Sequence, residues 1–207
     1  RRLQAVTAST ALARGIFTDD SVHLGITGGF GEEGAMARLT EADVVLVVGA
    51  GLNQFTMRFG ELFGEGTTVI RIDVDEVAPP NTQHSLTHHL VRGDAKVTLE
   101  AVLAGLGAGR PDRAWRDEVA QEIAEGRIRV PDTGADSTSA DGLCADGRLD
   151  PRRVANRIGE LLPEDIHITS DGGHFIGWAN MFWPVASPER LSMVGTAYQT
   201  IGLGFST

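Results

Sequence analysis

Two apolar runs rich in β-branched residues dominate the hydrophobic pattern of the chain, at residues 43–48 and 68–74. A glycine-containing break separates them, followed by apolar residues at helical intervals, which predict a crossover helix over residues 54–63. Strands this apolar are typical of a parallel sheet that is buried on both faces. The pattern therefore predicts an α/β core in which strand, helix and strand follow one another.

The same alternation extends from the amino terminus to residue 106. The remaining elements that we expect there are a strand at 3–7, a glycine-rich loop at 25–34, a helix at 33–41, a strand at 89–92 and a helix at 95–106 that Asp94 caps. The glycines of the loop favour either a close approach to another segment or a flexible connection. Repeated strand–helix units indicate a doubly wound, Rossmann-like parallel sheet.

The second half of the chain begins differently and then returns to this pattern. A charged amphipathic helix is expected at 112–126, and residues 132–147 have the composition of a mobile linker. Asp150 and Pro151 then predict a helix start. The elements expected after it are a helix to residue 162 with Val154, Ile158, Leu161 and Leu162 on its apolar face, a strand at 166–170, a helix at 175–182 and a strand at 191–194.

These changes predict three segments. Residues 1–107 form a middle Rossmann-like domain, residues 108–148 a linker with one amphipathic helix, and residues 149–207 the start of a second α/β domain. The chain has no initiator Met and ends within a glycine-punctuated pattern, so we expect a fragment of a longer polypeptide.

Composition narrows the classes of protein that fit. The formal net charge of −10 argues against binding nucleic acid or anionic lipid through a general electrostatic field. No apolar run is long enough to span a bilayer, and no signal peptide is visible. Cys144 is the single cysteine and cannot form an internal disulfide. We therefore expect a cytoplasmic protein without nucleic-acid or membrane partners.

Glycines and carboxylates follow the strands of the first half, where open α/β sheets bind their ligands. Gly49 and Gly51 lie after the first apolar run, without the third glycine of a dinucleotide fingerprint. A tight turn and a nucleotide contact both fit them. Asp73 follows the next strand and fits either a ribose contact or a solvated loop. Together with Asp94, these residues are candidates for binding an ADP moiety.

The second half carries a similar arrangement on two consecutive units. The run Asp171-Gly172-Gly173-His174 follows a predicted strand, and a glycine-punctuated segment at 195–205 follows the next. Glycines let a backbone approach a phosphate closely, although a plain strand–helix turn also fits. His84, His88 and His89 form a small cluster, but a zinc site needs three or four converging ligands. We assign no metal ligand to this chain.

These residues resemble a known family. The runs at 42–49, 69–75 and 91–95 are similar to the middle domain of the thiamine-diphosphate-dependent enzymes of the acetolactate synthase type. The run at 171–174, with Trp178-Ala179 after it, and the segment at 195–205 are similar to the opening of the last domain of this family. The resemblance implies that the protein decarboxylates a 2-oxo acid and passes the resulting acyl-carbanion equivalent to an acceptor or a proton.

The resemblance also implies roles for particular residues, all of them in the last domain. Those expected to bind the cofactor are Gly172, Gly173, His174, Gly195 and Gly202. Ile201 stands where the family has a bulky apolar residue that supports the bent form of the thiamine. Such enzymes are homodimers or homotetramers, with active sites between the first domain of one subunit and the last domain of another.

Departures from the family pattern set limits on these implications. The Gly-Asp-Gly motif that binds Mg²⁺ and the first domain with its activating glutamate are not in the sequence, so we expect the Mg²⁺ ligands outside this chain and the fragment alone to be inactive. FAD-binding members carry an Arg-Phe-Asp-Asp-Arg-like run where this chain has residues 52–56, which disfavours FAD. The alternatives are an ADP- or CoA-recognising member similar to oxalyl-CoA decarboxylase, and a relative that has lost the chemistry.

Overall fold

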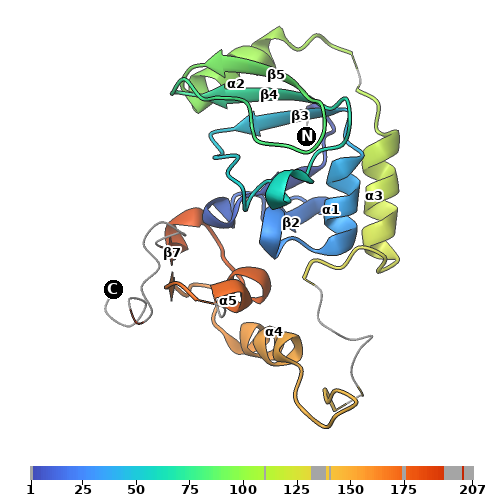
Figure 1. The fold of residues 1–207 in the computed structure, drawn as a ribbon, viewed down its shortest axis with the longest axis vertical. Coiled ribbons are helices and arrows are strands. Elements are labelled where there is room, and N and C mark those ends of the chain that lie inside the picture. Colours follow the sequence, from blue (N-terminus) through green and yellow to red (C-terminus); the bar gives the residue numbers. More distant parts are fainter. Residues whose placement is uncertain are drawn as a thin grey trace. The chain divides into compact units, whose positions relative to one another are not determined.

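The structure is a computed structural model that describes residues 2–109, 111–131, 139, 141–173, 176–193 and 202. These residues form mixed α/β structure with three small parallel sheets (Figure 1). The strands are β1 (Thr7–Ser9) paired with β2 (His23–Ile26), then β3 (Val44–Val48), β4 (Thr68–Asp73) and β5 (Thr87–Arg92) in that order, and β6 (Ile168–Ser170) paired with β7 (Leu191–Met193). The predicted Rossmann-like α/β class is confirmed.

The chain divides into two compact units. Unit 1 comprises Arg1–Val6, Thr27–Gly29 and Glu33–Arg127, and unit 2 comprises Thr7–Ile26, Phe30–Glu32 and Ile128–Thr207. The division into a middle domain, a linker and a second domain stays a prediction, and part of the predicted linker lies outside the described residues. No helix in the described ranges combines the length and the hydrophobicity that crossing a bilayer requires.

In unit 1, β3 is buried on one face and exposed on the other. Val47 is buried on the first face, whereas Val44 is 61% exposed on the second, beside Leu46 and Val48. The prediction that this strand is buried on both faces is therefore wrong. The reason is that α2 (Ala95–Gly105) packs mainly against β4 and buries none of its own residues fully. The side chain of Asp94 accepts a hydrogen bond from the Val97 N–H at 3.0 Å, which confirms the predicted cap.

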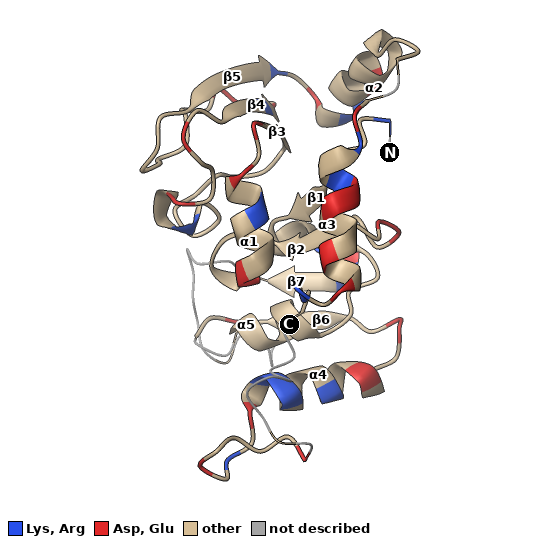
Figure 2. Ribbon diagram, turned by 90° about the vertical axis from the view of Figure 1, so that its right-hand side faces the viewer, with Lys and Arg blue, Asp and Glu red and all other residues tan. Residues whose placement is uncertain are grey.

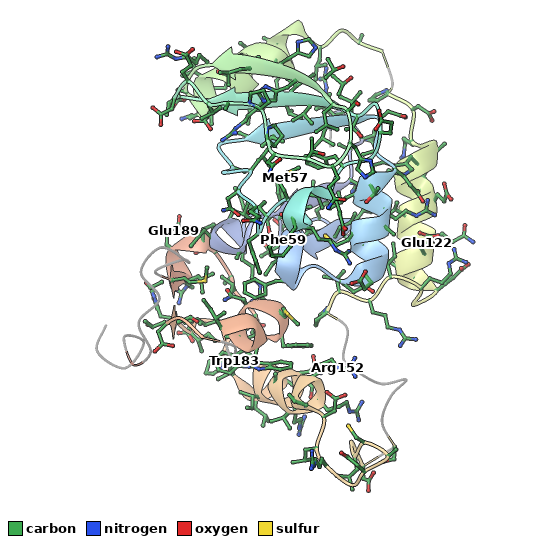
Figure 3. All side chains as sticks on the ribbon, viewed as in Figure 1. Met57, Phe59, Glu122, Arg152, Trp183 and Glu189 are labelled. Carbon is green, nitrogen blue, oxygen red and sulfur yellow. The ribbon has the colours of Figure 1, made fainter. Side chains whose placement is uncertain are left out.

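The connection between β3 and β4 is not the predicted crossover helix. It makes one helical turn, in which the Met57 N–H donates to the Asn53 carbonyl at 2.9 Å, and a short 3-10 turn at Arg58–Gly60 follows. Arg58 and Phe59 both have positive φ, at 50° and 56°, which a continuing α-helix does not allow. Leu62 and Phe63 are buried as expected, but Phe59 is 60% exposed (Figure 3).

The glycine-rich stretch before α1 contains a strand and a tight turn. β2 overlaps the start of the predicted loop at 25–34, and β1 lies at 7–9 rather than at 3–7. In unit 1, the turn at Gly28 and Gly29 lies directly against Phe55, and the Gly29 N–H donates to the Phe55 carbonyl at 3.2 Å. Of the two readings for these glycines, close approach is therefore the correct one.

Helices α1 (Glu33–Thr40) and α3 (Ala114–Ala124) lie side by side in unit 1 and are joined by ion pairs (Figures 1 and 2). Ala35, Met36 and Leu39 of α1 are buried, as predicted. The guanidinium of Arg38 binds the Glu122 carboxylate through two contacts of 2.6 Å. The same guanidinium contacts Glu41 and Glu118, so one arginine connects the two helices.

We expect the Glu122→Gln variant to lower the melting temperature at neutral pH by about 2–4 °C, because it removes a bidentate ion pair. Hydrogen bonding to Arg38 lowers the pKa of Glu122 in the folded state. A carboxyl whose pKa is lowered by folding stabilises the protein above its unfolded pKa, and that contribution disappears as the pH falls through the folded value. The difference between wild type and variant should therefore shrink below about pH 4.5.

Thermal unfolding followed by circular dichroism between pH 3 and 7 measures this difference. Glu41→Gln is the matched control, since Glu41 makes a single, more exposed contact with the same guanidinium. It should cause a smaller change. An equal effect of Glu122→Gln at every pH would contradict the assignment of the lowered pKa to this pair.

In unit 2, α4 (Pro151–Leu161) begins as predicted, because the Asp150 carboxylate accepts the Arg152 N–H at 2.8 Å and Pro151 occupies the first turn. Its buried face is not the predicted one. Ala155 and Gly159 are buried against α5 (Ile176–Phe182), whereas Val154, Ile158 and Leu161 are exposed. The reason is steric: α5 and the residue after it approach the helix so closely that only small side chains fit between them.

Candidate functional site

The carboxyl ends of β6 and β7 lie at the same edge of their sheet, since the two strands are parallel and Ser170 pairs with Met193. This is the edge at which open α/β sheets bind ligands. The predicted glycine loop starts here, with Asp171 directly after β6. Ile168 and Leu191 of the two strands belong to a core cluster with Val185, so the strand pair is anchored in the interior of unit 2.

Asp171 connects the predicted glycine loop after β6 to Gly202. Its side chain is 8% exposed, and its Oδ2 accepts the backbone N–H of Gly202 at 2.5 Å. Gly202 has φ +99°, a conformation that glycine adopts without strain, and no atom lies within 4 Å of the position of an added Cβ. The structure thus brings the loop after β6 together with a residue 31 positions further along the chain.

Gly172 and Gly173 form the loop between β6 and α5. Gly172 is buried, and Gly173 has φ +126°. The Gly173 carbonyl accepts the Ile176 N–H at 3.2 Å, so this loop runs directly into α5. Since α5 has only seven residues, we place no anion site on its amino end alone. The glycine backbone is the part of this loop that fits close approach to a phosphate.

Asn180 of α5 is a site neighbour that the sequence analysis did not identify. It is fully buried, and its Nδ2 donates to the Ile176 carbonyl at 2.8 Å and to the Met193 sulfur at 3.3 Å. It therefore fastens α5 to the carboxyl end of β7. Within the described part of the chain, its Oδ1 has no hydrogen-bond partner. A single polar residue among the apolar side chains of α5 was the available signal.

Arg14 is the second residue that the sequence analysis did not identify. Its guanidinium donates to the Ala179 carbonyl at 2.7 Å and to the Trp183 carbonyl. Burial lowers the pKa of Arg14 to about 10, so the side chain stays charged at neutral pH. A positive charge at the carboxyl end of a helix is favourable, and Arg14 therefore holds α5 in place behind the glycine loop.

The four candidate nucleotide residues lie in unit 1, near the carboxyl ends of β3, β4 and β5. Gly49 has φ +60° and donates its N–H to the Ile72 carbonyl at 2.9 Å, while the space beside Gly49 and Gly51 is open. Asp73 accepts from Arg71 at 3.1 Å and from the Asp75 N–H at 3.2 Å, and the second contact contributes most to its lowered pKa. Since Asp94 caps α2, both carboxylates have local structural roles.

Three residues of the predicted cofactor site, His174, Gly195 and Ile201, lie outside the described residues. The histidine cluster does not converge: His84 lies in a loop near Glu65, and His88 and His89 point to opposite faces of β5. Burial lowers the pKa of His88, and its Nε2 has no hydrogen-bond partner in the described ranges. No group of three or more potential metal ligands occurs among the described residues.

Comparisons with known proteins agree with this architecture. Residues 1–102 match the family described as "Thiamine pyrophosphate enzyme, central domain". The acetolactate synthase of Mycobacterium avium is 25% identical over 182 residues, which are 87% of this chain and 28% of that protein. Residues 1–102, just under half of the chain, therefore match the thiamine-pyrophosphate-dependent enzyme family, and the chain is similar to its members of the acetolactate synthase type.

Two further relatives have similar sequence identities. The sulfoacetaldehyde acetyltransferase of Rhodobacter capsulatus is 28% identical over 176 residues, covering 77% of this chain and 29% of the relative. The acetolactate synthase large subunit of Haemophilus influenzae is 25% identical over 212 residues, covering 99% of this chain and 34% of the relative. The chain thus spans about a third of the length of these curated relatives.

A solved structure supports the fold. The crystal structure of benzoylformate decarboxylase from Polynucleobacter necessarius superimposes with a TM-score of 0.57 at 19% sequence identity. The match covers 93% of this chain and 32% of that chain. At this identity the likeness concerns the fold alone, and it agrees with the parallel α/β organisation described above.

Proposed function

We propose that the protein containing this chain uses thiamine diphosphate to decarboxylate a 2-oxo acid and to pass the remaining acyl-carbanion equivalent to an acceptor or a proton. The observation that supports this most is the hydrogen bond between Asp171 and Gly202, which brings Gly202 to the glycine loop after β6. The family match adds the class of cofactor. The neighbouring strand ends of β6 and β7 provide the edge at which such a ligand binds.

The proposed site residues would bind the two ends of this cofactor. Gly172 and Gly173, with His174, would hold the diphosphate, because a glycine backbone allows close approach to phosphate oxygens. Gly202, with Gly195 and Ile201, would contact the thiamine, and the open space beside Gly202 leaves room for a ring. The bound cofactor supplies the electron sink for breaking the carbon–carbon bond, while the protein binds and orients it. Mg²⁺ would be held by residues outside this chain.

Thermal shift measurements on the purified protein test the proposal. We expect thiamine diphosphate with Mg²⁺ to raise the melting temperature by several degrees, since a ligand that binds only the folded state stabilises it. Thiamine monophosphate with Mg²⁺ is the control that lacks the terminal phosphate, and it should give a smaller shift. The absence of any shift with thiamine diphosphate would reject the enzyme proposal in favour of a relative that kept the fold and lost the chemistry.

Replacing Ile201 by alanine should lower turnover at least about tenfold while changing the melting temperature little, because the side chain is proposed to support the reactive shape of the cofactor. Steady-state kinetics with saturating cofactor, together with thermal unfolding, measure both quantities. Ile158→Ala, at an exposed position of α4, is the control for the same truncation of an isoleucine away from the proposed cofactor site. Equal losses of turnover and stability in Ile201→Ala would reduce Ile201 to a packing residue.

A nucleotide site in unit 1 is a second candidate. The open space beside Gly49 and Gly51, at the carboxyl end of β3, favours it. Against this, Asp73 and Asp94 already serve as acceptors for neighbouring backbone N–H groups. We propose that ADP, or a CoA group that contains it, binds at this edge if any nucleotide does. Thermal shifts with ADP and with FAD, measured separately, decide between ADP, FAD and an empty edge.

The remaining parts of the proposal concern the whole protein. Its substrate would be a small 2-oxo acid, its assembly a homodimer or homotetramer, and its location the cytoplasm. The isolated chain would be inactive, because family active sites are formed between two subunits. Sedimentation analysis of the purified protein and its activity with a panel of 2-oxo acids test these points.

A further inference from the structure

Asp171 occupies an unusual position for a carboxylate next to a proposed diphosphate loop. It is more than nine-tenths buried, and its Oδ2 is turned toward the Gly202 N–H. Burying a carboxylate is unfavourable unless donors satisfy it, so the contact with Gly202 is costly to lose. The hydrogen bond from the Gly202 N–H to the Asp171 carboxylate therefore restrains the position of Gly202.

Gly202 is hydrogen-bonded to a residue at the carboxyl end of the β6–β7 strand pair. Ser170 and Met193 form the last register pair of β6 and β7, and Asn180 fastens Met193 to α5. Asp171 follows Ser170 directly, so its backbone is fixed by the strand. Through the carboxylate, the position of Gly202 is set relative to the same strand end that carries Gly172 and Gly173.

We propose that Asp171 is a positioning residue that sets the distance between Gly202 and the Gly172–Gly173 loop, and thereby the length of the thiamine diphosphate site. This inference rests on the proposed function. The cofactor has its phosphates at one end and its aminopyrimidine ring at the other, so both ends can be bound only if the two segments are held at the right spacing. A carboxylate that faced the diphosphate would repel it. The Asp171 carboxylate instead accepts the Gly202 N–H, so it affects the cofactor site by positioning Gly202.

Variants of Asp171 separate positioning from plain packing. Asp171→Asn keeps an acceptor oxygen of the same size, and Asp171→Ala removes it. We expect Asp171→Ala to weaken binding of thiamine diphosphate with Mg²⁺ about tenfold, which is the effect of one hydrogen bond to a charged group. Asp171→Asn should bind within about threefold of wild type, because a neutral acceptor retains most of the contact. Asp165→Ala removes an exposed carboxylate just before β6 and should bind like wild type.

A second readout does not depend on the cofactor. Hydrogen exchange followed by mass spectrometry, on protein without cofactor, should show faster exchange in Asp171→Ala for the peptide that contains Gly202. The same peptide should exchange at the wild-type rate in Asp165→Ala. If Asp171→Ala does not fold, Asp171→Glu replaces it, since it keeps the charge but displaces the oxygen by one methylene.

The outcomes distinguish this inference from the function on which it rests. Faster exchange at Gly202 with weaker binding in Asp171→Ala, and near-normal values in Asp171→Asn, would support it. Unchanged exchange, or unchanged affinity, would overturn it even when wild type binds the cofactor. If wild type itself fails to bind thiamine diphosphate, the proposed function is wrong and the positioning role is rejected together with it.

Discussion

Replacing Gly28 with alanine is expected to lower the free energy of unfolding by about 2–5 kcal/mol, from a left-handed backbone that disfavours Cβ and from overpacking. Gly28 has φ +84°, and an added Cβ would lie 2.2 Å from the Phe55 carbonyl oxygen and 2.8 Å from the Thr56 Cα. Both neighbours are backbone atoms, so no side-chain rotation relieves the clash. The turn would have to move away from the connection between β3 and β4.

Gly66→Ala is the matched control for this prediction. Gly66 has a similar φ of +80°, but no atom lies within 4 Å of its added Cβ. Its substitution should therefore show only the backbone penalty, about 1–2 kcal/mol. Urea unfolding of both variants measures the difference. Equal destabilisation of Gly28→Ala and Gly66→Ala would mean that the turn does not contact Phe55 in solution.

Replacing Gly159 with alanine is the second prediction with a large effect. We expect this variant to be less stable than wild type, although helix propensity alone would make it more stable. Alanine in place of glycine within a helix normally stabilises it by up to about 1 kcal/mol. At Gly159 an added Cβ would lie 2.8 Å from the Phe182 carbonyl oxygen and 3.4 Å from the Trp183 ring. We expect a destabilisation of about 1–3 kcal/mol, since α4 and α5 must separate to admit the methyl group.

The contact that would be disturbed is visible in the structure. Trp183 lies between α5 and α4 (Figure 3), and its indole N–H donates to the Ala155 carbonyl at 3.1 Å. Separating the helices would lengthen this bond, so the tryptophan fluorescence of the variant should shift to longer wavelength. Gly105→Ala, near the end of α2 with no atom within 4 Å of its added Cβ, should instead be neutral or stabilising. Stabilisation by Gly159→Ala would refute the close packing of the two helices.

Local patterns in the sequence were sufficient for many of the elements. The buried face of α1 follows from the spacing of Ala35, Met36 and Leu39, and the helix starts at Asp94 and Asp150 follow from side chains that accept nearby N–H groups. The β-branched runs became β3 and β4 in parallel register. These features depend on interactions within a few residues, so they can be predicted directly from the sequence.

Elements that depend on distant partners were predicted less well. The segment at 54–63 has helical periodicity, yet Phe55 is in contact with the Gly28–Gly29 turn and Phe59 leaves the helical conformation. Similarly, the apolar side chains of β3 and α4 did not show which face of each element is packed against the rest of the protein. Burial is decided by neighbours that lie far away in the sequence, and hydrophobicity alone does not identify them.

The candidate site shows the same division. The sequence by itself determined the glycine runs, their position after strands and the family that they resemble, since these are properties of residue order. Only the tertiary structure decided that Asp171 binds Gly202, that Arg14 contacts the end of α5 and that Asn180 joins α5 to β7. Each of these contacts joins polar groups from separate segments, and they meet only because burial of the apolar core brings the segments together.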